Sequence, residues 1–285
     1  MIGKTGMTSK LIAIGSGKGG VGKTLTTMNL AMSFAKDGAK VLILDGDMGL
    51  SNVDVLAGKK TDKTIDDIIL NGATIADIVF PVAQNISLIS SGSGLFNLAN
   101  LPRYKRQILF DQMQSYRSND DVILIDTAAG ISDQVLQFHQ ASDLSVIVAT
   151  PEPHSLTDAY ALIKILSEEI NRKEFYVIIN QARTIEEGQH VFLRLNEVAI
   201  KFLKTKLTFL GTVTHDPALH SLILRRQILS DKTLKTVAGQ NWIEVASNLR
   251  AAYRDVNRGS NVQELFNSMI WTREGGAYES SRQAL

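Results

Sequence analysis

The ten residues GSGKGGVGKT (15–24) contain five glycines and two lysines. The part from Gly17 to Thr24 fits the pattern G-x-x-x-x-G-K-[ST], which is typical of loops that bind nucleotide phosphates. It follows an apolar run, LIAIG (11–15), and precedes an expected helix, which is the context that the motif requires. The alternative is a glycine-rich turn without a ligand. The stretch predicts a strand, a phosphate-binding loop and a helix in succession.

Each residue type in this loop has a physical role toward phosphate. Glycines let successive backbone N–H groups converge on phosphate oxygens, and the N-terminus of the following helix adds partial positive charge. Lys23 would supply a mobile full charge, and Thr24 would offer its hydroxyl to Mg²⁺. The residues of the loop that we expect to bind nucleotide are Gly17, Gly19, Gly20, Val21, Gly22, Lys23 and Thr24.

Short apolar runs recur along the chain. After the first they are KVLILD (40–45), ISLIS (86–90), DVILID (121–126), LSVIVA (144–149), FYVIIN (175–180) and LTFLGTV (207–213). Nearly continuous Val, Ile and Leu, without polar alternation, is typical of parallel strands covered on both faces, and helical stretches separate most of the runs. The sequence therefore predicts an α/β fold, a doubly wound, mostly parallel sheet with helices on both faces.

The chain of 285 residues is 44% hydrophobic and 21% charged, which indicates one soluble globular domain. Residues 10–258 should form this domain, after an N-terminal extension over 1–9. We expect a C-terminal amphipathic helix over 259–272 and a flexible tail over 273–285.

Composition excludes several classes of function. The chain has no cysteine, which excludes disulfides, thiolate zinc sites, iron–sulfur clusters and cysteine nucleophiles. The 30 Lys and Arg residues nearly balance the 29 Asp and Glu, so no global positive field favours nucleic acid, and we expect no direct DNA binding. No secretory signal and no apolar run of about 18 residues is found, which predicts a cytoplasmic protein.

A simple phosphate cradle does not require Lys18. The stretch KGGVGKT (18–24) resembles the deviant Walker A motif of the MinD/ParA family of P-loop ATPases, which are of the SIMIBI type. In that family the extra lysine reaches the phosphates of the partner subunit in a nucleotide-sandwich dimer. The resemblance implies ATP and Mg²⁺ as cofactors, a homodimer in the ATP state, and a catalytic role for Lys18 linked to dimerisation. A solvated loop lysine is the alternative.

Two further segments match the family at the carboxyl ends of expected strands, where open α/β sheets bind ligands. In ILDGDMGLSNVD the resemblance makes Asp47 the residue that orients the attacking water or accepts its proton, and it places Asp45 near the metal. In VILIDTAAGI it makes Asp126 the Walker B carboxylate, held near Mg²⁺ through water. Gly130 would contact the γ-phosphate.

The resemblance also implies two contacts with the base of the nucleotide. Asn180 closes an expected strand at the position where an asparagine in relatives hydrogen-bonds the adenine edge, which favours ATP over GTP. Relatives carry Val-Pro-x-Asp after the next strand, whereas this chain has Val213, Thr214, His215 and Asp216. Asp216 matches that pattern, and the missing proline leaves the details of the base pocket open.

Within the family, EPHSLTDAYALIK (152–164) and the segments around Asp47 and Asp126 resemble the flagellar-number regulators of the FleN/FlhG group. The resemblance implies slow, dimerisation- or partner-stimulated ATP hydrolysis and control of flagellar biosynthesis. It implies antagonism of a flagellar transcriptional activator of the AAA+ class, alongside a pathway with an FlhF-type GTPase.

Partner contacts are expected at Glu152, Ser155 and Asp158, where dimers of the family meet. Alternatively, Ser155 caps a helix and Asp158 stabilises its first turn through the helix dipole.

The segment NVQELFNSMIW is amphipathic, and in MinD-like proteins such a helix anchors the ATP dimer to the membrane. Its apolar face consists of Val262, Leu265, Phe266, Met269 and Ile270. No Lys or Arg flanks this face before Arg273, whereas helices at a membrane surface usually have a basic polar face. Contact with the inner face of the cell membrane and packing on the protein or a partner both stay open.

Two other functions within the family are alternatives. A MinD-type cell-division ATPase should end in a basic amphipathic helix, and a ParA-type DNA-segregation ATPase should carry a basic surface for DNA. Outside these, a biosynthetic ligase of the same superfamily should not need Lys18. A module that only senses ATP would not hydrolyse it.

Overall fold

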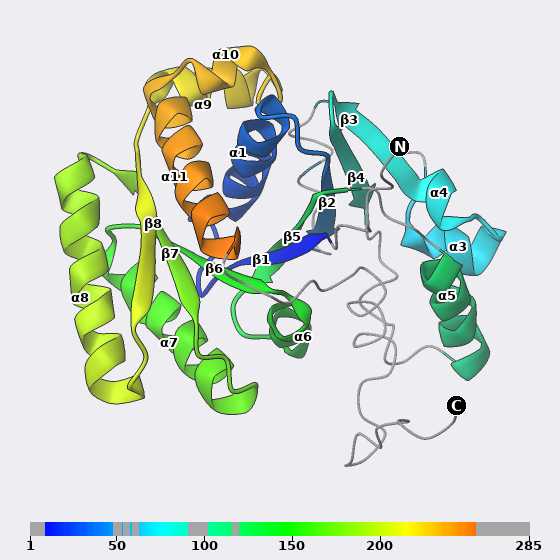
Figure 1. The fold of residues 1–285 in the computed structure, drawn as a ribbon, viewed down its shortest axis with the longest axis horizontal. Helices are drawn as coiled ribbons and strands as arrows, with labels where there is room; N and C mark the ends of the chain where they lie inside the picture. The colour runs from blue at the N-terminus through cyan, green and yellow to red at the C-terminus, as the bar shows by residue number, and fades with distance from the viewer. Residues whose placement is uncertain are drawn as a thin grey trace, which may run out of the picture.

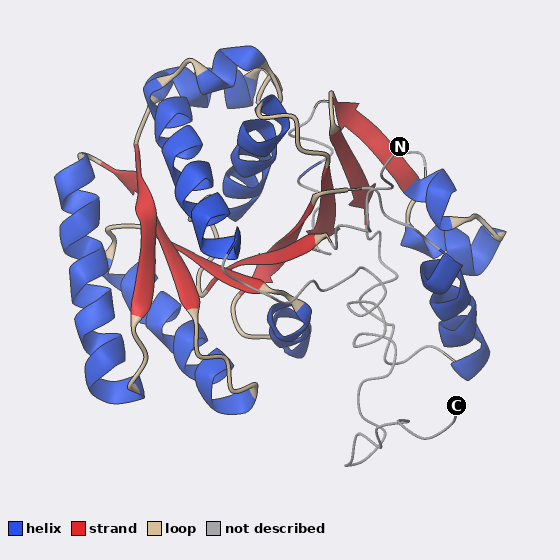
Figure 2. Cartoon of the chain, viewed as in Figure 1, coloured by secondary structure: helices blue, strands red, loops and turns tan. Residues whose placement is uncertain are grey.

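The computed structural model describes residues 9–47, 53, 58, 63–90, 102–115 and 120–254. In these ranges one eight-stranded sheet has the order β3-β4-β2-β5-β1-β6-β7-β8, and helices cover both of its faces (Figures 1 and 2). The strands are β1 (Lys10–Ser16), β2 (Val41–Gly46), β3 (Val79–Ala83), β4 (Ile86–Ser90), β5 (Val122–Ala129), β6 (Leu144–Ala149), β7 (Phe175–Ala182) and β8 (Leu207–Thr214). The predicted fold class and all seven predicted strands are confirmed.

Two layers of helices bury the sheet. Helices α1 and α11 pack on one face, where Phe34 and Trp242 are among the largest buried side chains. Helices α7 and α8 cover the other face beside β6, β7 and β8, and α3 and α6 cover it beside β2 and β5. The helices are α1 (Lys23–Lys36), α3 (Ile65–Asn71), α4 (Ile75–Ile78), α5 (Arg103–Ser115), α6 (Asp133–Ala141), α7 (Pro153–Glu169), α8 (Ile185–Leu203), α9 (Pro217–Leu224), α10 (Asp231–Leu234) and α11 (Val237–Arg254).

Strand β3 is not predicted by the apolar pattern of the sequence. It contains Pro81 and pairs antiparallel with β4 at the edge of the sheet, while all other neighbouring strands in the described ranges pair in parallel. A proline donates no hydrogen bond, so a sheet accepts it at an edge. The five-residue strand is only partly buried, which explains its weak signal in the sequence.

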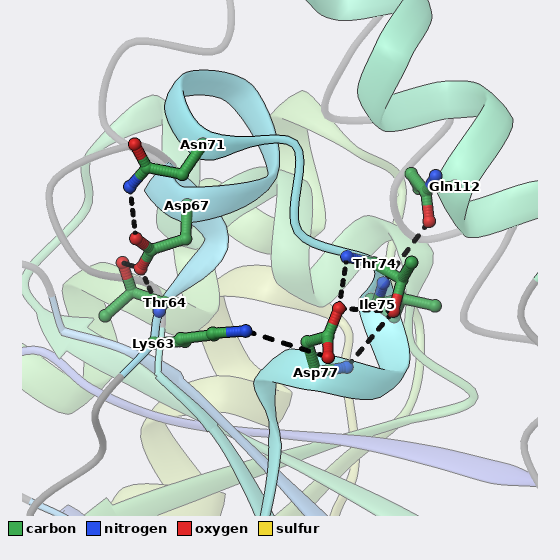
Figure 3. A network of polar contacts seen from close by, with 8 residues as sticks. All are labelled: Lys63, Thr64, Asp67, Asn71, Thr74, Ile75, Asp77 and Gln112. Atoms are coloured by element: carbon green, nitrogen blue, oxygen red, sulfur yellow. Dashed lines mark hydrogen bonds and ion pairs between the residues drawn. The ribbon is translucent and has the colours of Figure 1, made fainter.

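Side chains cap the N-termini of the two short helices α3 and α4, which precede β3 (Figure 3). The carboxylate of Asp67 accepts the backbone N–H of Thr64 at 2.7 Å, and that of Asp77 accepts the backbone N–H of Thr74 at 2.8 Å. These bonds lower the pKa of both aspartates. Lys63 pairs with Asp77 at 3.7 Å and so links the starts of α3 and α4. Capping boxes of this kind satisfy N–H groups that a helix leaves unpaired.

The expectation that Ser155 caps a helix is wrong. Helix α7 begins at Pro153, with Glu152 in the capping position, because proline fits the first turn, where its missing N–H is not needed. Ser155 is buried inside the helix, and its hydroxyl oxygen accepts the backbone N–H of Thr150 at 2.9 Å. The serine therefore fixes the loop before α7.

The predicted C-terminal helix over 259–272 with its apolar residues lies outside the described residues, and so do residues 1–8 of the predicted extension over 1–9. The last described helix, α11, ends at Arg254. Within the described ranges, no helix has the length and apolar content needed to span a bilayer.

Helix α8 lies close to β8 at Gly188, where a Cβ atom would come within 2.1 Å of the Thr212 hydroxyl oxygen. Gly188→Ala should therefore lower the free energy of unfolding by about 1–3 kcal/mol, as overpacked cores do. Urea denaturation measures this value. The exposed neighbour Gln189→Ala is the control, with a change within about 0.5 kcal/mol. Equal stability of both variants would contradict the close packing of α8 on β8.

Candidate nucleotide-binding site

The glycine loop connects the carboxyl end of β1 to the N-terminus of α1. Gly20 and Gly22 have φ angles of 79° and 92°, in the left-handed region that glycine adopts readily. At Gly17 a Cβ atom would lie 2.0 Å from the carbonyl oxygen of Asp158, so α7 packs directly on the loop backbone. No side chain caps the N-terminus of α1. Its first N–H groups are thus available to an anion.

The side chain of Lys23 lies beneath the loop. It is only 7% exposed, and its Nζ donates to the Ser16 hydroxyl at 2.9 Å. Burial lowers the pKa of Lys23, while the charges of Asp126 and Asp47 oppose this shift. Ser16 in turn donates to the carbonyl oxygen of Lys18 at 2.7 Å. The desolvated ammonium thus lies between the loop and the carboxylates.

Two aspartates occupy adjacent strand ends beside the loop. Asp45 of β2 and Asp126 of β5 are directly opposite in the parallel register, and both are buried. Burial and the charge of Asp126 raise the pKa of Asp45 to about 7. Burial raises the pKa of Asp126 to about 6, against the polar interaction with the Thr24 hydroxyl and the charge of Lys23. The positive charge of Lys23 therefore does not fully compensate the burial of these two carboxylates.

The donor set fits a divalent cation bound together with phosphate. Asp126 accepts from the Thr27 hydroxyl at 3.3 Å through Oδ1, but its buried Oδ2 has no hydrogen-bond partner among the described residues. Such an atom is costly unless a ligand contacts it. No group of three or more His, Asp or Glu side chains in the described ranges could hold a metal by itself. The hydroxyl of Thr24, water and phosphate oxygens would have to complete the coordination of Mg²⁺.

Asp47 and Gly130 both lie beside the loop. The backbone N–H of Asp47 donates to Asp45 Oδ1 at 3.1 Å, and the charge of its carboxylate partly opposes the lowering of the Lys23 pKa by burial. Gly130 has a φ of 94°, and its N–H donates to the carbonyl oxygen of Ser16 at 2.9 Å. The structure thus brings the ends of β1, β2 and β5 to one point.

The side chain of Lys18 contacts the start of α7. Its Nζ pairs with Glu152 Oε2 at 2.7 Å, and this hydrogen bond and charge lower the pKa of Glu152. The side chains are 40% and 64% exposed, so the pair contributes little stability and can be exchanged at small cost. Asp158 lies half-buried in α7, beyond the first turn, so the expectation that it stabilises that turn through the helix dipole is wrong. Contact of Glu152, Ser155 and Asp158 with a second subunit stays a prediction.

The residues expected to contact the base have partners within the chain. The side-chain amide of Asn180 donates to the carbonyl oxygen of Val21 at 2.8 Å, and so contacts the loop itself. Asp216 is the N-cap of α9 and accepts from the N–H groups of Ala218 at 2.8 Å and Ala238 at 3.0 Å. Their contact with adenine stays a prediction.

Sequence reasoning missed several residues that support the site, among them Ser16, Thr27 and His139. Ser16 and Thr27 flank the motif, but nothing in their spacing indicates that their hydroxyls contact Lys23 and Asp126. His139 packs against β1 just before the loop, because a Cβ atom on Gly15 would come within 2.3 Å of its Nε2. Its Nδ1 is 3.0 Å from the Ser145 hydroxyl. Burial, together with the charge of Arg172, lowers the pKa of His139 to about 3.

Comparisons with known proteins agree with this geometry. A family model described as an AAA domain matches residues 9–178. The antiactivator FleN of Pseudomonas aeruginosa is 32% identical over 84% of this chain and 86% of its own length. The flagellum site-determining protein YlxH of Helicobacter pylori is 38% identical over 85% and 82%. The septum site-determining protein MinD of Pyrococcus horikoshii, complexed with Mg-ADP, shares the fold with a TM-score of 0.67 at 22% identity, covering 88% of this chain and 100% of that chain.

The neutral imidazole of His139 should make stability depend on pH. An unfolded chain takes up a proton at His139 near pH 6.5, whereas the folded protein resists it down to a pKa of about 3. His139 should therefore contribute a fall in the free energy of unfolding as pH drops through 6.5, by up to about 1.4 kcal/mol per pH unit. The raised pKa values of Asp45 and Asp126 contribute with the opposite sign in this range, so the part due to His139 is the difference between the wild type and a variant without it. Urea denaturation between pH 7 and 4 tests this, with His139→Gln expected to lack this part of the slope. Identical slopes for both proteins would rule out the assignment.

Proposed function

Because this chain belongs to the MinD/ParA family of P-loop ATPases, in the group of FleN and YlxH, we propose that it is an ATP-dependent dimerising switch that regulates flagellar number. One observation carries the proposal. Lys23, Thr24 and the buried Asp126 converge where β1 and β5 end, and the carboxylate has an oxygen without a partner in the described ranges. This arrangement matches what a magnesium-bound triphosphate needs.

The proposed reaction is transfer of the γ-phosphoryl group of ATP to water. Lys23 and the loop N–H groups would neutralise the phosphates, and Thr24 and Asp126 would hold Mg²⁺, Asp126 through water. When bound, the cation would supply charge neutralisation between the β- and γ-phosphates. Asp47, next to Asp45 at the end of β2, would orient the attacking water or accept its proton. Asp45 would lie near the metal, and Gly130 would contact the γ-phosphate.

Dimerisation would complete the site. Lys18 is held by Glu152 on the surface, and among the described residues it has no hydrogen bond to the site carboxylates Asp45 and Asp126. The pair is exposed, so a second subunit could take over Lys18 at small cost. Each lysine would then neutralise phosphate bound by the other subunit. Hydrolysis would be slow in monomers, and the nucleotide state would set the oligomeric state.

The names of the relatives support a flagellar role. FleN is called an antiactivator and YlxH a flagellum site-determining protein, and this chain covers more than four fifths of each. We propose a flagellar transcriptional activator of the AAA+ class as the partner of the ATP dimer, in a pathway with an FlhF-type GTPase. The net charge of +1 offers no support for DNA binding of the ParA type. Peripheral contact with the cell membrane is a further part of this proposal.

Dimerisation should require ATP and Lys18. The Asp47→Ala variant should bind ATP without cleaving it and sediment as a dimer with Mg-ATP, but as a monomer with Mg-ADP. Adding Lys18→Ala should weaken the dimer at least about tenfold, because a charge on the shared phosphate is lost. The exposed Lys164→Ala on α7 is the matched control and should leave the dimer unchanged. A dimer that is equally stable with either nucleotide would overturn the switch.

Partner binding should follow the nucleotide. A purified flagellar activator of the AAA+ class should be retained by immobilised Asp47→Ala protein in Mg-ATP and released in Mg-ADP, because only the dimer presents the composite surface. Quantified pull-down with both nucleotides measures this difference. Retention that does not depend on nucleotide, or none in either state, would contradict the antiactivator role while leaving the ATPase intact.

A further inference from the structure

Strand β7 contains one extra residue where it passes the phosphate loop. Ile179 pairs with Thr212 and Ala182 with Thr214, so three steps along β7 correspond to two steps along β8. Gln181, inside this bulge, has a φ of 59°, in the left-handed region that a glutamine seldom adopts. Bulges are frequent beside active sites, where they redirect side chains. The position of this bulge beside the phosphate loop therefore indicates a role in the site.

The bulge directs two consecutive side chains to the same target. In a regular strand, neighbouring side chains point to opposite faces. Here Asn180 donates to the carbonyl oxygen of Val21 at 2.8 Å, and Gln181 donates through Nε2 to that of Gly20 at 3.4 Å. A Cβ atom on Gly22 would lie 2.4 Å from Asn180 Nδ2. The phosphate loop and the bulge therefore fit closely together.

The bulge is firmly held on its other side. Helix α8 begins at Ile185, and its N-terminus is fixed by two hydrogen bonds: the N–H of Arg183 donates to the Glu187 carboxylate, and the N–H of Glu187 donates to the Thr184 hydroxyl. The N–H of His215 donates to the carbonyl oxygen of Ala182 at 2.8 Å and restores the pairing with β8. A fixed support of this kind can hold a glycine-rich loop, whose backbone is otherwise free to adopt many conformations.

We propose that the bulge at Asn180–Gln181 is a brace that holds the phosphate loop in its anion-binding conformation, with Gln181 as a positioning residue. Two amide donors fix the carbonyls of Gly20 and Val21, so that the N–H groups of the loop point toward the phosphates. The strain of the left-handed glutamine persists because a regular strand would turn one of the two amides away. The role in nucleotide binding rests on the proposed function, whereas the ordering of the loop does not.

The test uses the full chain with three substitutions. Gln181→Met keeps the length of the side chain but removes the amide donor. Gln181→Gly removes the donor and also relieves the backbone strain, so its free energy of unfolding should equal or exceed that of the wild type. Gln189→Met, at an exposed position of α8, is the control. Together they separate bracing from general destabilisation.

Two measurements follow. Without nucleotide, amide hydrogen exchange in the peptide containing Gly20 and Val21 should be faster in both Gln181 variants and unchanged in the control. Affinities for a fluorescent ADP and for inorganic pyrophosphate, which lacks the base, should fall by the same factor, about three- to tenfold. An equal loss for pyrophosphate separates loop bracing from contact with adenine.

Unchanged exchange in the loop together with unchanged affinities in both Gln181 variants would overturn the brace. A loss confined to ADP would also overturn it and would instead assign Gln181 to the base. If the wild-type protein bound neither ADP nor pyrophosphate, the proposed function would fall, and the exchange measurement would still decide whether the bulge orders the loop.

Discussion

The site depends on a charge imbalance that the parallel sheet imposes. Strands β2 and β5 are parallel neighbours, so Asp45 and Asp126 face each other in register inside the protein. Lys23 is the nearby cation, and burial disfavours its charge as well. Both aspartates therefore have raised pKa values, and Asp126 keeps an oxygen without a partner in the described ranges. In the proposed function, binding of Mg²⁺ with phosphate would relieve this imbalance and so couple the nucleotide to the stability of the site.

Several elements of the fold contact the phosphate loop. In the proposed function, a change in the bound nucleotide would be transmitted to them through the loop. Gly130 of the segment after β5 donates to Ser16, α7 packs its backbone on Gly17, and Asn180 of β7 donates to Val21. Each of these contacts comes from a different element of the fold. A change in the loop on binding or hydrolysis would therefore reach α7, where Glu152 holds Lys18. The proposed phosphate chemistry would thus be physically connected to the proposed subunit contact.

The sequence predicts the parts of the structure that follow from local pattern. Continuous apolar runs mark the parallel strands, and the loop motif fixes the position of Lys23, Thr24 and the start of α1. Strand β3 is not predicted from the sequence because Pro81 and the partial burial of the strand weaken its apolar pattern. The start of α7 is misplaced because Ser155 is a good capping residue, whereas Pro153 determines the first turn. The bulge in β7 and the position of His139 depend on packing between distant segments, so no local pattern reveals them.

In the proposed dimer, Lys18 of one subunit acts on ATP bound by the other, and this can be measured by mixing two inactive variants. Lys18→Ala keeps its own Asp47, and Asp47→Ala keeps the lysine that it lends to its partner. Each variant alone should hydrolyse almost no ATP. An equimolar mixture should recover about a quarter of the wild-type rate, because half of the random dimers contain one complete site. A mixture that is no more active than its components would contradict the account.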